Sequence, residues 1–184
     1  MRAFLDWVYR ASGALAAFFL VAICLVVLLQ VGANLIDALI KAFGGEPYGL
    51  VIPSYAEFAG FFLAAASFFA LAYTLRHGAH IRVELLLHRF GPRARRGIEV
   101  WCMAVGAFVS GYFAWYSFDL VLESVKFGDV SPGIVPIALW IPQSAMALGL
   151  AILAVAFVDE LVTLSRGGEA SYAGTAPAAA SEHE

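Results

Sequence analysis

The sequence predicts an all-α membrane protein with four transmembrane helices. Of its 184 residues, 62% are hydrophobic and only 14% are charged, with a mean hydropathy of +0.84. Soluble domains have an apolar share nearer one half. The apolar residues form long runs, and a helix needs about 20 such residues to cross the hydrocarbon core of a bilayer. The net charge of -3 gives no reason to expect a nucleic-acid partner.

The first two predicted spans are apolar runs with few polar interruptions. Residues 13–36 are broken only by Gln30 and Asn34, and residues 55–75 carry one acid, Glu57, near their start. The first run is longer than the roughly 7 to 15 residues of a signal-peptide core. We therefore expect it to stay in the membrane as an anchor.

The last two predicted spans carry their charges near the ends. Residues 98–121 have acids only at the margins, and residues 142–164 begin at Pro142. A proline suits the first helical position because its missing amide hydrogen would have no partner there. Asp159, the deepest acid of the fourth span, is expected to pair with an arginine of segment 76–96; the alternative is a proton or ion site.

The basic residues indicate which way the chain is inserted. Four crossings place both termini on the same side, and Lys and Arg are enriched on the cytoplasmic side. Nine basic residues fall on the side of the termini: Arg2, Arg10, Arg76, Arg82, Arg89, Arg93, Arg95, Arg96 and Arg166. Only Lys41 and Lys126 fall on the other side. We therefore expect both termini in the cytoplasm.

The chain is predicted to hold one membrane domain and a tail. Residues 1–165 contain all the apolar runs and form a single four-helix domain in this interpretation. Residues 166–184 are small and polar without apolar periodicity, so they cannot bury enough surface to offset the entropy of ordering. We expect them to be a disordered cytoplasmic tail.

Segment 76–96 is the most basic part of the chain. It holds six of the eleven Lys and Arg residues and a single acid, Glu84. Its apolar residues follow an i, i+3, i+4, i+7 pattern: Val83, Leu86, Leu87 and Phe90. We predict a short amphipathic helix at about 80–90 lying in the membrane interface, with Arg82 and Arg89 facing anionic lipid headgroups. The alternative is that the preference of basic residues for the cytoplasm explains this charge without a specific partner.

Polar residues on the opposite side indicate contact surfaces. Gln30, Asn34 and Asp37 lie on one helical face, and such groups seek partners in lipid, so we expect this polar stripe to meet another helix of this or another chain. Acids gather at the outer helix ends: Asp37, Glu46, Glu57, Asp119, Glu123 and Asp129. This rim suits a basic protein patch. Ordinary solvated helix ends are the alternative.

Two other membrane functions find little support in the residues. A four-helix anchor of a redox complex needs intramembrane histidines for haem. The histidines fall outside the spans: His77, His80, His88 and His183. An autonomous small transporter acting as a homodimer would place charges near the span centres, which have none. Cys24 and Cys102 are expected to be small buried apolar residues, so no cofactor is predicted and no catalytic motif is present.

Two motifs resemble a known family. The run ALAYTLRHGAHIRVELL, residues 70–86, resembles the signature after the second span in the small membrane subunit of tripartite ATP-independent periplasmic (TRAP) transporters. The run SPGIVPIALWIPQ, residues 131–143, is similar to the stretch that leads into the last span of that family. Glu57 also resembles a recurrent acid of the family. The order of these motifs and the four-span layout cover nearly the whole chain.

The resemblance implies a role in uptake of a small organic acid across the bacterial inner membrane. A periplasmic solute-binding protein would deliver the substrate, and a large multi-span subunit would carry it by an elevator movement driven by an ion gradient such as sodium. This chain would enlarge the static scaffold. Contact with the large subunit or the binding protein would involve Lys126, Asp129 and Gln143, while Trp140 would join the outer aromatic belt.

Overall fold

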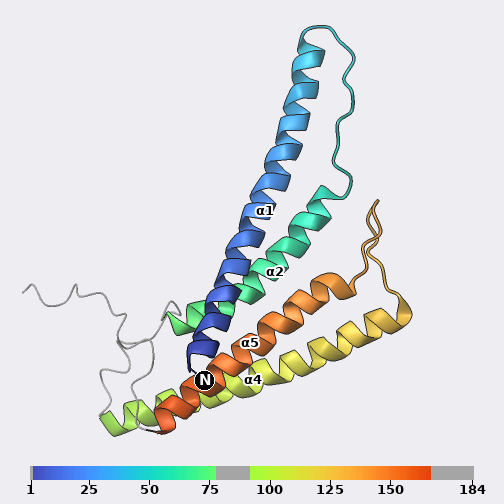
Figure 1. The fold of residues 1–184 in the computed structure, drawn as a ribbon. Helices are drawn as coiled ribbons and strands as arrows, with labels where there is room; N and C mark the ends of the chain where they lie inside the picture. The colour runs from blue at the N-terminus through green and yellow to red at the C-terminus, as the bar shows by residue number, and fades with distance from the viewer. Residues whose placement is uncertain (1, 78–91, 167–184) are drawn as a thin grey trace, which may run out of the picture.

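A computed structural model describes residues 2–77 and 92–166, and its described part is all-helical (Figure 1). The helices are α1 (Arg2–Ala42), α2 (Tyr55–Arg76), α4 (Pro92–Phe127) and α5 (Trp140–Ser165). All four are long and apolar enough to cross a membrane, in agreement with the prediction of four membrane-spanning helices. The predicted interfacial helix at about 80–90 and the tail beyond residue 166 lie outside the described residues.

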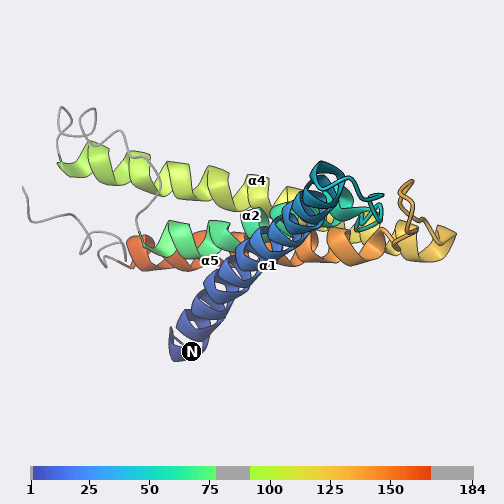
Figure 2. The ribbon, with the colours of Figure 1, turned by 90° about the horizontal axis from the view of Figure 1, so that it is seen from above.

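The helices form an open row rather than a closed bundle (Figures 1 and 2). α1 packs on α2, α2 on α5, and α5 on α4, so α1 and α4 are the two edges of the row. In Figure 1, α1 and α2 diverge from α5 and α4 toward the loop end, which carries the α1–α2 and α4–α5 connections, and Figure 2 shows α1 crossing the other helices obliquely. The opposite end, where α2 and α5 finish, is called the Arg76 end. An edge helix has a neighbour on one side only and leaves most of its surface uncovered.

α1 extends well beyond the predicted span. It has 41 residues and is about 60 Å long, roughly twice the hydrocarbon thickness. The extension toward the N-terminus follows from packing, because Leu5 and Tyr9 continue the buried face and enter a core cluster with Leu75 and Leu153. Hydropathy alone predicts that the helix stops where polar residues begin. Packing of Leu5 and Tyr9 on other helices stabilises the additional turns.

Two helices end in the same glycine-dependent way. Gly44 after α1 and Gly128 after α4 have φ values of 79° and 67°, a left-handed conformation that favours glycine. The next amides reach back to the helices, from Gly45 to the carbonyl of Ile40 at 2.9 Å and from Asp129 to Ser124 at 3.1 Å. These reverse bonds satisfy carbonyls that the helix ends would otherwise leave unpaired.

α5 starts earlier than predicted. Its first residue is Trp140 rather than Pro142, which lies third in the first turn. The proline still costs no hydrogen bond there, because the first turn of a helix has no carbonyl partners for its amides. At the other end, the Arg96 guanidinium donates to the Leu164 carbonyl at 2.7 Å and caps α5.

Small residues bring the helices of the row close together. Ala72 of α2 and both Ala147 and Ala156 of α5 are fully buried, and the Ser12 hydroxyl of α1 donates to the Phe69 carbonyl of α2. Gly149 lies directly against the backbone of Phe68. Transmembrane helices associate through such close contacts, since lipid tails offer no hydrophobic driving force between them.

The two cysteines do not lie in the core. Cys24 and Cys102 are both exposed on the protein surface, so the prediction that they are buried is wrong. They occupy outward faces of α1 and α4, and an open row leaves those faces uncovered. A small apolar side chain is equally compatible with lipid.

Candidate functional site

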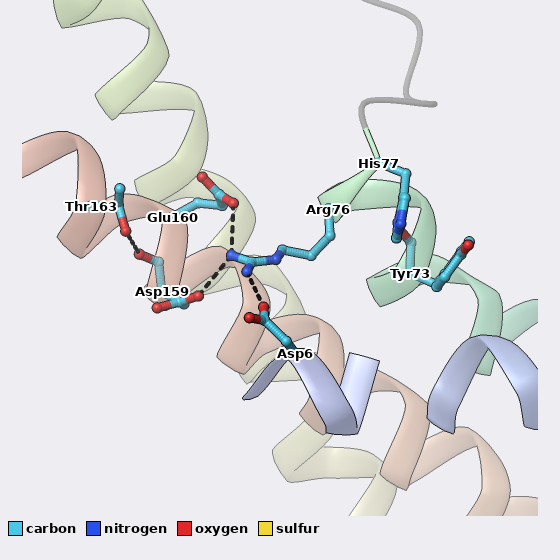
Figure 3. A network of polar contacts seen from close by, with 7 residues as sticks. All are labelled: Asp6, Tyr73, Arg76, His77, Asp159, Glu160 and Thr163. Carbon is cyan, nitrogen blue, oxygen red and sulfur yellow. Dashed lines mark hydrogen bonds and ion pairs between the residues drawn. The ribbon is translucent and has the colours of Figure 1, made fainter. Parts of the chain in front are cut away.

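A charged cluster joins three helices at the Arg76 end of the row (Figure 3). Arg76, the last residue of α2, donates to Asp6 of α1 at 2.5 Å, to Asp159 of α5 at 2.9 Å and to Glu160 of α5 at 3.2 Å. Its guanidinium also lies 5.0 Å from the centroid of the Tyr9 ring. The prediction that Asp159 pairs with an arginine of segment 76–96 is therefore confirmed, and the partner is Arg76.

The three acids of the Arg76 cluster differ in how deeply they are buried. The Glu160 side chain is completely buried, that of Asp159 is 19% exposed, and that of Asp6 is 46% exposed. A buried carboxylate depends on its charged partner, whereas an exposed ion pair contributes little because water screens it. Arg76 has a planar, forked guanidinium that can contact several oxygens at once. Because its side chain is completely buried, Glu160 is the acid whose charge depends most on pairing with Arg76.

The polar stripe of α1 meets a partner other than the expected helix. The Gln30 amide group donates to Asn34 at 2.9 Å and accepts from the Ile52 amide at 2.9 Å. The Asp37 carboxylate accepts from the Tyr48 amide at 3.1 Å and from the Leu50 amide at 2.9 Å. In the described chain, the stripe binds the backbone of the α1–α2 connection, which runs back along α1 (Figure 1). An extended segment has free amides, and side chains must satisfy them wherever water is scarce.

Replacing Asp37 with alanine should release the α1–α2 connection without unfolding the helices. Both bonds are exposed to water, which screens the charge, so each contributes about 0.5–1.5 kcal/mol and only the connection depends on them. We expect faster hydrogen exchange at the Tyr48 and Leu50 amides and an almost unchanged melting temperature. Asp119→Ala on α4 is the matched control. Unchanged exchange at both amides in the Asp37 variant would contradict this role.

The α4–α5 connection is a hairpin anchored on the start of α2. The Ser131 amide donates to the Ile137 carbonyl at 2.8 Å within the hairpin. The Val135 amide donates to the Ser54 hydroxyl at 3.0 Å. The Glu57 carboxylate packs against Gly133, where an added Cβ would lie 1.8 Å from Oε2. The two connections at the loop end are thus joined through the first turn of α2.

The remaining predicted contact residues are spread over the loop end. Lys126 lies in the last turn of α4 with its ammonium 5.5 Å from the centroid of the Phe127 ring. The Asp129 carbonyl accepts from the Leu139 amide at 3.0 Å in the hairpin. Trp140 begins α5 half-exposed, and the buried Oε1 of Gln143 has no hydrogen-bond partner within residues 2–77 and 92–166.

Three predicted lipid-contact residues lie in the segment the structure does not describe: Arg82, Glu84 and Arg89.

The sequence analysis assigned no specific contact to four residues that the structure places in the contacts described above: Asp6, Arg76, Glu160 and Ser54. Asp6, Arg76 and Glu160 are charged residues near the ends of apolar runs that are expected to reach the same side of the membrane. That position could have indicated that they lie close together. For Ser54, the signal was the S-x-x-E pattern that it forms with Glu57 at the start of a helix.

Four apolar helices with charges only near their ends define a multi-pass membrane protein. Residues 48–167, more than half of the chain, match the family described as tripartite ATP-independent periplasmic transporters, DctQ component. The chain therefore belongs to this family, that of the small permease subunits of TRAP transporters. The sequence-based identification is confirmed.

A curated relative supports this membership. The chain is 25% identical over 101 residues to the C4-dicarboxylate TRAP transporter small permease protein DctQ of Rhodobacter capsulatus. The match covers 55% of this chain and 44% of that protein, so the chain matches less than half the length of this relative. Among solved structures, none matches the chain.

Proposed function

We propose that this chain is the static scaffold subunit of a TRAP transporter for a small organic acid. A large multi-span subunit would carry the substrate across the bacterial inner membrane, driven by an ion gradient such as sodium. A periplasmic solute-binding protein would deliver the substrate. The chain itself would hold no substrate and would give the large subunit a fixed wall to move against.

The open row of helices is the observation that carries this proposal. Only 11% of the most apolar stretch of α1 and 17% of that of α4 is buried. The two inner helices reach only 28% and 33%. A closed bundle would cover its spans with its own helices, whereas a row presents two broad apolar faces that can be shared with another membrane protein and with lipid.

The placement of charge supports a scaffold over a conducting path. Ionisable residues that mark a transport path face a bundle interior or a water-filled cavity near the membrane centre. The Arg76 cluster lies at the helix ends and joins α1, α2 and α5. Such a cluster fixes helices relative to one another, which is what a static wall requires.

The proposal includes an orientation. Both termini and the Arg76 end would face the cytoplasm, where Arg82 and Arg89, with Glu84 between them, would hold the chain to anionic headgroups. The loop end would face the periplasm. Lys126, Asp129, Trp140 and Gln143, together with Glu57 and the stripe of Gln30, Asn34 and Asp37, would then lie on the side where the binding protein docks.

Purification of the tagged chain from its native membrane in mild detergent tests the scaffold role. We expect stoichiometric recovery of a much larger multi-span protein, identified by mass spectrometry, and no substrate uptake by the chain alone in liposomes. Recovery of the chain only as a monomer or homodimer, with uptake by the chain alone, would overturn the proposal in favour of an autonomous transporter.

A further inference from the structure

α2 begins with a sequence that normally caps its own helix. Ser54 and Glu57 form the S-x-x-E pattern of a capping box, in which the serine hydroxyl accepts from the amide three residues on and the glutamate accepts from the serine amide. Here the Ser54 side chain makes no capping bond, and its φ of 57° is left-handed, the only positive φ of a non-glycine residue in the described chain. A capping serine has an extended backbone instead.

Both side chains are directed to the α4–α5 hairpin instead. The Ser54 hydroxyl accepts from the Val135 amide at 3.0 Å. The Glu57 carboxylate lies so close to Gly133 that an added Cβ would be 1.8 Å from its Oε2, and among the described residues this buried oxygen has no hydrogen-bond partner. The capping box is therefore open, and the hairpin occupies the place where it would close.

With the hairpin bound to the start of α2, three features are energetically unfavourable, and each would disappear if the hairpin were released. The left-handed backbone of Ser54 is disfavoured for a residue with a Cβ. The start of α2 lacks its reciprocal caps. One oxygen of Glu57 is buried without a donor, which is unfavourable. Rotation of Ser54 into the extended region would close the box and give Glu57 the Ser54 amide as its donor.

We propose that Ser54 and Glu57 are a two-way latch, which either holds the α4–α5 hairpin against α2 or, when the hairpin leaves, caps α2. The free energy lost when the hairpin is released is then offset by the capping bonds that form when the box closes. A modest external contact can therefore shift the equilibrium between the two states. Resting on the proposed function, the external contact is the periplasmic solute-binding protein. It would take up the released hairpin, whose Ile134 side chain is 82% exposed.

Gly133→Ala in the full chain, within its purified complex, tests the latch by residue-resolved hydrogen exchange. The added methyl group would lie 1.8 Å from the Glu57 Oε2 and 2.9 Å from the Ser54 hydroxyl oxygen, so both side chains must move away and the hairpin loses its anchor on α2. The Val135 amide should exchange at least roughly fivefold faster through loss of one hydrogen bond. The Ser54 amide should exchange slower by a similar factor, because Glu57 now accepts from it. Ile134→Ala, at an exposed side chain of the same hairpin, should change neither amide.

Two further variants separate a latch from a merely loosened hairpin. Val135→Pro removes the amide donor without adding an atom at Gly133 and should also slow Ser54 exchange. Adding Glu57→Ala to either variant should abolish that protection, because the capped state needs the carboxylate. A faster Val135 amide with no slowing at Ser54 in Gly133→Ala, or no slowing in Val135→Pro, would overturn the latch.

The binding-protein step has its own readout. Adding the purified solute-binding protein to the unmodified complex should produce the same pair of changes as Gly133→Ala, faster at Val135 and slower at Ser54. If the variants show the pattern and the binding protein does not, the latch stands and the proposed docking fails. If the variants fail, the latch itself is wrong, whatever the binding protein does.

Discussion

Replacing Arg76 with methionine is expected to lower the free energy of unfolding by about 3–5 kcal/mol, the usual result of removing one partner of a buried ion pair. Arg76 is 17% exposed and faces the fully buried Glu160. Methionine keeps the apolar stem but supplies no charge, so the carboxylates of α1 and α5 lose the cation that joins them. The melting temperature in detergent and the yield of monodisperse protein measure the effect.

The control for Arg76→Met is Arg10→Met on α1. Arg10 is exposed, so the change should alter stability by no more than about 0.5 kcal/mol. Arg76→Lys should be intermediate, because an ammonium is a point charge that cannot fork toward several oxygens. A loss as small for Arg76→Met as for Arg10→Met would contradict the role of the cluster in joining helices.

A second variant identifies the acid that matters most. If burial of Glu160 dominates, Glu160→Gln combined with Arg76→Met should recover part of the loss, since no buried charge is then left beside the missing cation. Asp6→Asn should recover little, because its side chain is nearly half-exposed and water already screens the charge.

Hydropathy predicted the order and approximate positions of the four long helices in the part of the chain that the structure describes. The cost of an unpaired backbone in lipid forces each long apolar run to be a helix, so periodicity was not needed to distinguish helix from strand. Helix ends were less predictable. The N-terminal turns of α1 continue because Leu5 and Tyr9 pack on other helices, and nothing within residues 2–12 specifies those neighbours.

The arrangement of the helices could not be obtained in the same way. The different faces of an apolar helix have similar hydropathy. The sequence therefore does not indicate which face contacts protein and which contacts lipid. The burial expected for Cys24 and Cys102 was wrong for this reason. The polar stripe of Gln30 and Asp37 was expected to meet another helix, whereas in the described residues its partners include backbone amides of the α1–α2 connection, which every non-proline residue carries and no sequence pattern marks.

Charged contacts were partly predictable. An acid deep in a span needs a cation, and that argument led from Asp159 to the arginines of segment 76–96. Which arginine serves depends on the axial offset between α2 and α5. Gly149 lies directly against the backbone of Phe68, and we expect this contact, which composition does not reveal, to fix that offset.

Gly149→Ala is therefore expected to disturb more than its own position. A Cβ at Gly149 would lie 2.7 Å from the carbonyl carbon and the Cβ of Phe68. Backbone cannot yield as a flexible side-chain end can, so α2 and α5 must separate or slide, at a cost of about 1–3 kcal/mol for overpacking. Sliding would also shift Arg76 away from Asp159 and Glu160.

Gly111→Ala on α4 is the matched control for Gly149→Ala, since nothing lies within 4 Å of its added Cβ. Alanine favours a helix over glycine by about 1 kcal/mol, so this control should be neutral or stabilising. The decisive comparison is a double-mutant cycle with Arg76→Met. If Gly149 sets the register for the Arg76 cluster, the two losses in stability should be less than additive, because the cluster is already weakened in the Gly149 variant. Strict additivity would mean that the glycine contact and the ion pairs hold α2 to α5 independently.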